Sequence, residues 1–171
     1  MPSFLKQQKR EIKKKYRAIR KSIDPNCAAE SLVKTFHQHL NYIKGKTVAA
    51  YIPMDGEINV IPLMYNLANL GFKIAIPNKK KLLIFEKWEE EGESIVPDTI
   101  ITPVVAFDDH FNRLGFGGGW YDRMIEQLRP LGKMFIGVAY EAQYCKDLPT
   151  ETHDQKLDMI VTETRVRIRK S

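Results

Sequence analysis

The stretch TVAAYIPMDGEINVIPLMYNLANLGFKIAIP, residues 47–77, decides the fold. It begins with the apolar run 47–53 and ends with the apolar run 73–77, and each run has the length of a buried strand. Between them, residues 60–70 have the pattern of a helix that ends at Gly71. A strand, a helix and a second strand in this order are typical of a unit whose two strands lie parallel.

The same alternation of strands and helices continues on both sides of this unit. Helices are predicted at 4–23, at about 28–42 and directly after the glycine cluster at 115–119. Further strands are predicted at 82–88, 99–108, 133–140 and 158–163. The sequence therefore predicts an α/β fold: a single three-layer αβα domain over residues 1–171, with a mainly parallel, Rossmann-like sheet covered on both faces.

Length and composition narrow the class of protein further. A chain of 171 residues suits one domain, and its two cysteines, Cys27 and Cys145, are too few for a disulfide framework. No apolar run approaches the roughly 18 residues needed to span a bilayer, and the first ten residues lack the apolar core of a secretory signal. We therefore expect a cytoplasmic protein with reduced thiols and no membrane partner.

Positive charge is concentrated in the predicted first helix. Residues 1–21 contain nine Lys or Arg and one Glu, whereas the whole chain has a net charge of +6, so the remainder is slightly acidic. On a helix, Lys9, Lys13 and Arg20 lie along one flank of an apolar stripe. This stripe consists of Ile12, Tyr16, Ile19 and Ile23. The row of cations has the charge to clamp a triphosphate, but the pattern alone favours a solvated basic face or a patch for RNA or acidic lipid.

Four of the ten glycines fall within residues 115–119, between a predicted strand and a predicted helix. Glycines let backbone N–H groups approach an anion closely, and the helix N-terminus adds its positive dipole end. Arg113 supplies a planar fork for phosphate oxygens, and Asp122 in the first helical turn is placed to hold Mg²⁺ beside them. The stretch is neither a P-loop nor a dinucleotide fingerprint. The pattern favours a phosphate site over a tight turn without a ligand.

Acidic residues near strand ends give weaker signals. Glu57 follows the carboxyl end of the strand at 47–53, where ligands bind in open α/β sheets, so it is a candidate for contact with a polar substrate. Asp154 and Asp158 precede the last predicted strand, and their positions alone assign them no role. The histidines at 37, 39, 110 and 153 have no metal-binding spacing.

The stretch RLGFGGGWYDR, residues 113–123, resembles the signature loop of 5-formyltetrahydrofolate cyclo-ligases, also called 5,10-methenyltetrahydrofolate synthetases. Their pattern runs Arg-Leu-Gly, an aromatic or basic residue, Gly-x-Gly, two aromatics and Asp. The resemblance spans nearly the whole chain. It includes KREIK (9–13), the segment around Glu57, VPDTIITPVVAFD (96–108), GVAYEAQ (137–143) and LPTETHDQKLDMIVTE (148–163).

The resemblance implies a reaction that uses ATP and Mg²⁺ to convert 5-formyltetrahydrofolate, a reduced folate, to 5,10-methenyltetrahydrofolate. The formyl oxygen takes the γ-phosphoryl group, N10 attacks the activated carbon, and ADP and phosphate are released. Such catalysis depends mainly on positioning and on stabilisation of charge. This agrees with a site rich in backbone donors, Arg and Lys.

The resemblance also implies roles for particular residues. ATP would contact Lys9, Arg10, Lys13, Arg113, Leu114, Gly115, Phe116, Gly117, Gly118, Gly119, Trp120 and Tyr121. The folate would contact Ile52, Glu57, Phe116 and Trp120. Glu57 would form hydrogen bonds with folate nitrogens, and Trp120 would stack on the substrate. The Mg²⁺ ligands would be Asp122 and Asp154.

The chain departs from the family pattern at four places. Lys13 stands where Arg is usual and so loses a bidentate fork, and Trp120 replaces a Tyr and its hydroxyl. Phe111 occupies a turn position that is usually Gly, which predicts a differently built loop before Arg113. The segment 85–97 is short and lacks the aromatic-Gly-Ile-x-Glu-Pro stretch that helps to enclose the folate in relatives.

Two other functions stay open on the sequence. The short segment 85–97 motivates a related ATP-using or nucleotide-binding enzyme with another substrate. The basic helix motivates an RNA-binding module, although the near-neutral remainder of the chain and the lack of an RNA-binding motif make nucleic acid the weaker alternative.

Overall fold

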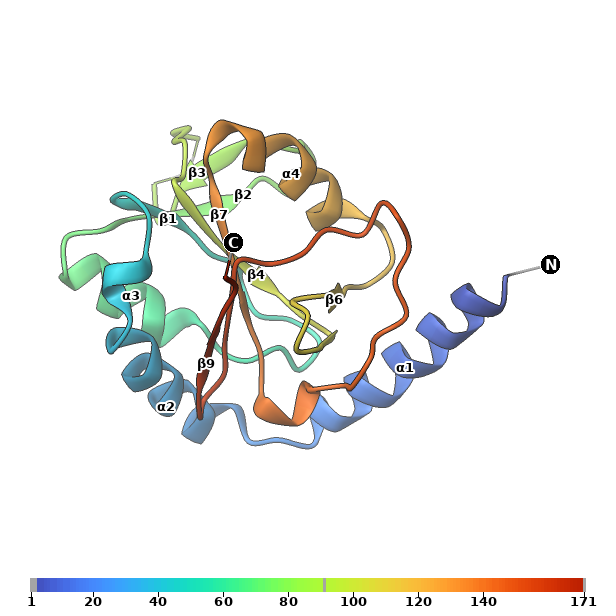
Figure 1. The fold of residues 1–171 in the computed structure, drawn as a ribbon. Helices are drawn as coiled ribbons and strands as arrows, with labels where there is room; N and C mark the ends of the chain where they lie inside the picture. Colours follow the sequence, from blue (N-terminus) through green and yellow to red (C-terminus); the bar gives the residue numbers. More distant parts are fainter. Residues whose placement is uncertain (1–2, 91, 171) are drawn as a thin grey trace.

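The computed structural model describes residues 3–90 and 92–170 (Figure 1). Within these residues a seven-stranded sheet has the order β3-β2-β1-β4-β7-β8-β9. Its strands are β1 (Thr47–Ala49), β2 (Lys73–Pro77), β3 (Phe85–Lys87), β4 (Thr99–Pro103), β7 (Met134–Val138), β8 (Met159–Val161) and β9 (Val166–Ile168). The five central strands run parallel, whereas β3 and β9 pair antiparallel at the two edges. The prediction of a mainly parallel α/β sheet is confirmed.

Helices cover both faces of this sheet. The helices are α1 (Phe4–Lys21), α2 (Pro25–His37), α3 (Ile61–Asn69) and α4 (Trp120–Leu128), with short turns η1 (Leu40–Tyr42), η2 (Arg129–Leu131) and η3 (Glu141–Gln143). Figure 1 shows α2 and α3 on one face, α4 on the other, and α1 along one end of the sheet. The predicted three layers are therefore present. None of the helices in the described ranges is long and apolar enough to cross a membrane.

Two apolar clusters hold the layers together. The α2–α3 side contains Phe36 and Ile101, and the α4 side contains Ile125 and Ile100, all fully buried. Ile100 and Ile101 are neighbours on β4 and point to opposite faces, as the two-residue period of a strand requires. Burial of each such side chain contributes about 1.5–3 kcal/mol, so the central strand stabilises both layers.

The connection between α1 and α2 differs from its prediction. The first helix ends at Lys21 rather than at residue 23, and the second begins at Pro25 rather than at about residue 28. The Asp24 side chain caps the second helix by accepting a hydrogen bond from the Asn26 N–H (3.0 Å). Proline suits the first helical position, because the N–H that it lacks would have no partner there. Pro25 therefore starts α2 as well as ending the preceding segment.

The prediction of one continuous strand at 99–108 is wrong. β4 ends at Pro103, and the chain then leaves the sheet to form β5 (Ala106–Phe107), which pairs antiparallel with β6 (Arg113–Leu114). The buried Gln143 side-chain amide donates to the carbonyl oxygens of Val104 (2.7 Å) and Val105 (2.9 Å) in place of a neighbouring strand. Unbroken apolar sequence does not reveal this change of partner.

The bounds of several other elements differ, and two strands were missed. The predicted strand 47–53 shortens to β1, the helix predicted to reach residue 42 ends at His37, and β3 covers only part of 82–88. β6 and β9 were not predicted because two or three residues carry too little periodicity.

A glycine in β7 gives a test of the packing. A Cβ on Gly137 would lie 2.5 Å from Leu157 Cδ1 and 3.1 Å from Val104 Cγ2, so Gly137→Ala should overpack the core. We expect the free energy of unfolding, measured by urea denaturation, to fall by about 1–3 kcal/mol. Gly118→Ala is the matched control, because a Cβ there meets no heavy atom within 4 Å. Equal destabilisation by both substitutions would contradict this packing.

Candidate functional site

A cavity of about 680 Å³ opens at the carboxyl end of β4. β1 has β2 on one side and β4 on the other, so the strand order reverses here, and α/β sheets bind ligands at such a switch point. The walls come from α1, from the turn after β1, from the loop between β6 and α4, and from residues 151–154. All twelve residues predicted to contact ATP line the cavity, and so do Glu57, Asp122 and Asp154. Ile52 is 48% exposed and is not among the lining residues.

A tight turn before β6 delivers Arg113 to this cavity. The buried Asp108 carboxylate accepts hydrogen bonds from the N–H groups of His110 (2.9 Å) and Asn112 (3.1 Å). Phe111 has φ = +65°, the left-handed conformation that favours glycine. The turn thus has the geometry expected of a glycine although Phe111 stands there. The Phe111 side chain packs against the core on the α4 side, which offsets part of the strain.

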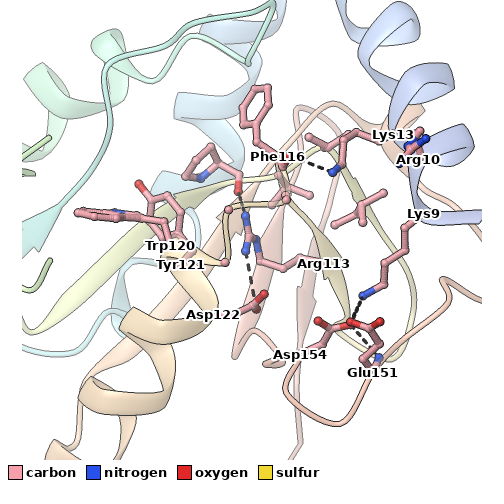
Figure 2. A pocket seen from close by; sticks show the side chains of 18 of the residues that line it. Lys9, Arg10, Lys13, Arg113, Phe116, Trp120, Tyr121, Asp122, Glu151 and Asp154 are labelled. Carbon is pink, nitrogen blue, oxygen red and sulfur yellow. Dashed lines mark hydrogen bonds and ion pairs between the residues drawn. The ribbon is translucent and has the colours of Figure 1, made fainter. Parts of the chain in front are cut away.

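The Arg113 side chain is 5% exposed and lies at the centre of the site (Figure 2). Its Nη2 donates to the Pro103 carbonyl oxygen (3.2 Å), and its Nη1 lies 3.9 Å from Asp122 Oδ1. Among the described residues, its buried Nε has no hydrogen-bond partner. Burial lowers the pKa of this guanidinium. A largely buried cation that lines a cavity is suited to bind an anion, because the anion would compensate its buried charge.

The glycine loop leaves room for two cations. A Cβ on Gly115 would lie 2.6 Å from Arg113 Nη2, and a Cβ on Gly117, which has φ = +108°, would lie 2.7 Å from Lys13 Nζ. Lys13 Nζ also donates to the Phe116 carbonyl oxygen (2.9 Å). Side chains in place of these glycines would push the cations away. α4 begins directly after the loop without a side-chain cap, so its first N–H groups remain suited to an anion.

The row of cations on α1 is only partly as predicted. Lys9, Arg10 and Lys13 line the cavity, and burial together with the neighbouring Lys9, Arg17 and Arg10 lowers the pKa of Lys13. These neighbouring cations repel one another, and a bound polyanion would reduce that repulsion. Arg20 does not belong to the row, because its side chain is fully buried behind the wall. A helical projection gives the flank of a residue but not how deep its side chain reaches.

An acidic corner faces Lys9. Lys9 Nζ lies 2.6 Å from Asp154 Oδ2 and 3.4 Å from Glu151 Oε2, and His153 Nε2 lies 3.1 Å from Glu151 Oε2. Ligand atoms of Glu151, His153 and Asp154 all lie within 4.8 Å of one another. Glu151 was not predicted from the sequence, and His153 was assigned no role. The run ETHD at 151–154 was the available signal.

The predicted metal pair, Asp122 and Asp154, is only partly brought together. Both carboxylates line the cavity, but Asp122 Oδ1 accepts from the Gln155 N–H (3.2 Å) and is not part of the acidic cluster among the described residues. Figure 2 shows Asp122, Asp154 and Glu151 below Arg113. Carboxylate oxygens are the ligands that Mg²⁺ prefers, so this end of the cavity fits the ion chemically.

Glu57 lies on the opposite side of the strand switch from the acidic corner. It ends a tight turn in which its N–H donates to the Met54 carbonyl oxygen (3.0 Å) and its Oε1 accepts from the Met54 N–H (2.9 Å). The residue is 7% exposed, and this burial raises the pKa of its carboxyl. Phe116, Trp120 and Tyr121 supply aromatic surface to the same cavity. The arrangement offers one buried acid and flat apolar walls to a ring system.

The segment 85–97 contributes no described residue to this cavity. Apart from residue 91, it consists of β3 and a return in which Glu86 and Ser94 form a single antiparallel bridge. The aromatic side of the cavity therefore depends on the glycine loop and α4 for its walls.

The fold and the cavity define an α/β protein with a cavity at the switch point of its sheet, lined by cations and by a glycine loop. Residues 84–163 match the model of the 5-formyltetrahydrofolate cyclo-ligase family. A 5-formyltetrahydrofolate cyclo-ligase of Haemophilus influenzae is 30% identical over 181 aligned positions, which cover 91% of this chain and 97% of the relative. The corresponding protein of Escherichia coli K12 is 29% identical over 72% of this chain and 81% of the relative.

A solved structure agrees with these relatives. The NMR structure of the 5,10-methenyltetrahydrofolate synthetase of Aquifex aeolicus superimposes with a TM-score of 0.81, at 27% identity, over 95% of this chain and 94% of that one. The chain belongs to the 5-formyltetrahydrofolate cyclo-ligase family. The predictions of the family and of an enzyme are thereby confirmed.

The buried Glu57 carboxyl predicts a pH dependence of stability. Because burial raises its pKa above the ordinary 4.5, the folded protein holds this proton to higher pH than the unfolded chain does. Its contribution to stability is fully present below 4.5 and is lost as the pH rises through the raised value. The stability of the native chain relative to Glu57→Gln should therefore fall as the pH rises from below 4.5 through the raised pKa. Urea denaturation of both proteins measures this difference, and a difference that stays constant would contradict the burial of an acid at this position.

Proposed function

We propose that this chain catalyses the ATP-dependent cyclisation of 5-formyltetrahydrofolate to 5,10-methenyltetrahydrofolate, with release of ADP and phosphate. The observation that carries the proposal is the Arg113 guanidinium, which is 5% exposed and lines the same cavity as the glycine loop. Family membership supports the identity of the substrate. The anion site supports a second substrate that carries phosphates.

In this mechanism the triphosphate lies between the glycine loop and α1. Arg113 and Lys13 hold phosphate oxygens, and Lys9 exchanges its contact with Asp154 for the nucleotide. The backbone N–H groups at the start of α4 add further donors. Negative charge spreads over the transferred phosphoryl group during the reaction, so fixed cations stabilise the transition state.

The folate lies on the aromatic side of the cavity. Its formyl oxygen attacks the γ-phosphorus, and the bond from that phosphorus to the bridging oxygen of ADP breaks. N10 then attacks the activated formyl carbon and loses its proton, and the carbon–oxygen bond breaks as phosphate leaves. Glu57 binds ring nitrogens of the folate, and Trp120 and Phe116 cover its flat surface. The cavity supplies positioning and charge, and no protein nucleophile is needed.

Asp122 and Asp154, with Glu151 beside them, would hold Mg²⁺ at the phosphate end of the cavity. Bound there, the ion neutralises charge on the phosphates. A cytoplasmic location stays a prediction.

The direct test follows methenyl product by its absorbance, with purified protein, ATP, Mg²⁺ and 5-formyltetrahydrofolate. The proposal expects product only when all three reactants are present. Absence of product above background would refute it. ATP turnover with another pterin but not with 5-formyltetrahydrofolate would support the alternative substrate that the short segment 85–97 motivates.

Asp122→Asn tests the metal end of the site. The substitution keeps the shape of the side chain and removes one charged oxygen ligand, which should cost several kcal/mol of transition-state stabilisation, a loss of ~100-fold or more in kcat. The circular dichroism spectrum should stay native. A Mg²⁺ titration measures the effect, and an unchanged dependence of kcat on Mg²⁺ would show that Asp122 does not hold the ion.

Replacing Lys9 and Lys13 together by Gln tests the nucleotide clamp. Lys and Gln have similar helix propensity, so α1 should form as before. KM for ATP should rise at least ~tenfold, and KM for the folate should move much less. Lys14→Gln with Lys15→Gln is the matched control, since both side chains are exposed on the same helix. If the helix bound RNA instead, both pairs would lower RNA affinity and its salt slope, and ATP kinetics would stay native.

A further inference from the structure

A second cluster of charges lies beside the cavity and has no part in the proposed mechanism. The Asp55 carboxylate accepts hydrogen bonds from Arg17 Nε (2.7 Å), Arg17 Nη2 (2.9 Å) and Arg20 Nη2 (2.7 Å). Lys21 Nζ lies 2.8 Å from Asp55 Oδ1. The hydrogen bonds from Arg17, and then those from Lys21 and Arg20, hold the pKa of this carboxyl well below its usual range although burial opposes them. Three cations of α1 therefore converge on one side chain that is 14% exposed.

Asp55 belongs to the same tight turn as Glu57. The turn spans Met54 to Glu57, and its two central residues, Asp55 and Gly56, have φ = +54° and +74°. A Cβ on Gly56 would lie 2.8 Å from Lys21 Cγ, so the turn packs directly against the end of α1. Contacts that fix Asp55 against α1 therefore also fix the direction in which the Glu57 side chain leaves the turn.

The glycine loop rests on the same cluster. The Phe116 ring lies over the guanidinium groups of Arg20 (5.2 Å) and Arg17 (5.3 Å). Fully buried Arg20 also donates to the carbonyl oxygens of Asp55 (2.8 Å) and Val104 (3.2 Å). The Phe116 carbonyl oxygen accepts from Lys13. α1, the Glu57 turn and the glycine loop are thus joined through Asp55 and the two arginines that it orients.

We propose that Asp55 is a positioning residue that sets these three elements relative to one another, so that binding of both substrates depends on it. The inference rests on the proposed function, which places the nucleotide at Lys13 and the folate at Glu57. Asp55 acts through Arg17 and Arg20 and does not line the cavity. Without its charge, buried Arg20 loses its anionic partner, and the Phe116 ring loses its fixed support.

Electrostatic attraction alone predicts the opposite change in nucleotide affinity when the charge of Asp55 is removed. Asp55 is an anion close to a cationic cavity, so removal of its charge alone would strengthen the attraction for a triphosphate. Positioning requires that nucleotide binding become weaker. The direction of change in nucleotide affinity upon Asp55→Asn therefore separates the two roles.

The experiment measures dissociation constants by calorimetry for a non-hydrolysable ATP analogue with Mg²⁺ and, separately, for 5-formyltetrahydrofolate. We expect Asp55→Asn to weaken both by at least ~threefold. Lys13→Gln should weaken only the nucleotide, and Glu57→Gln only the folate. Asp109→Asn is the matched control, because Asp109 pairs with Arg167 (3.5 Å) away from the cavity, and it should change neither constant.

A double-mutant cycle identifies the route of the effect. If Asp55 acts through the placement of α1, Asp55→Asn should weaken nucleotide binding by less than ~twofold in a protein that already carries Lys9→Gln and Lys13→Gln, which remove both α1 cations that hold the phosphates. Losses that multiply in the combined variant, tighter nucleotide binding upon Asp55→Asn alone, or a lower melting temperature with both constants unchanged would each overturn the inference. If Asp55→Asn does not fold, Arg17→Gln replaces it, because that change keeps the pair between Arg20 and Asp55. Loss of a cation weakens nucleotide binding by charge alone, so the folate then decides: folate binding weakened by at least ~threefold supports the inference, and unchanged folate binding overturns it. Wild-type protein that binds neither ligand would overturn the proposed function itself.

Discussion

The carbonyl oxygen of Val104 is the point from which the rest of the site is built. It stands where β4 leaves the sheet, and it accepts hydrogen bonds from the side chains of Gln143 (2.7 Å) and Arg20 (3.2 Å) instead of from a strand. Both donors are buried, so the loss of either would leave a polar group without a partner inside the protein, at a cost of about 1–3 kcal/mol. Because the chain turns outward here, the β5–β6 pair and the glycine loop lie over the carboxyl edge of the sheet.

Charge is arranged around this turn in two parts that do different things. The α1 cations nearest the C-terminus of the helix all pair with Asp55, which offsets one of their three charges, and these pairs hold the helix to the body. Those nearer the N-terminus face the cavity, where Lys13 has no carboxylate partner within the described residues and Lys9 has Asp154. The first group fixes the helix before a ligand binds, so binding does not have to order it. The second group supplies the attraction for an anion.

The sequence was informative wherever a local pattern has one physical meaning. Alternating apolar strands and helices predicted the parallel sheet, and the glycines before α4 marked the loop that comes close to Arg113 and Lys13, because few other residues allow the backbone such an approach. The sequence did not predict features that depend on contacts between residues far apart in the chain. Val104 and Val105 look like strand residues, Arg20 looks like a surface cation, and only the folded chain brings Gln143 and Asp55 to them. Glu151 was missed because its neighbour Lys9 is 142 residues away in the sequence.

The central claim is that one cavity brings the formyl oxygen of the folate to the γ-phosphorus of ATP, so that this oxygen leaves with the phosphate. The most direct measurement uses 5-formyltetrahydrofolate with ¹⁸O in the formyl group and follows the isotope shift in the ³¹P NMR spectrum of the released phosphate. The account predicts that each phosphate formed with the methenyl product carries one ¹⁸O atom from the formyl group. Phosphate without the label, formed together with methenyl product, would contradict it.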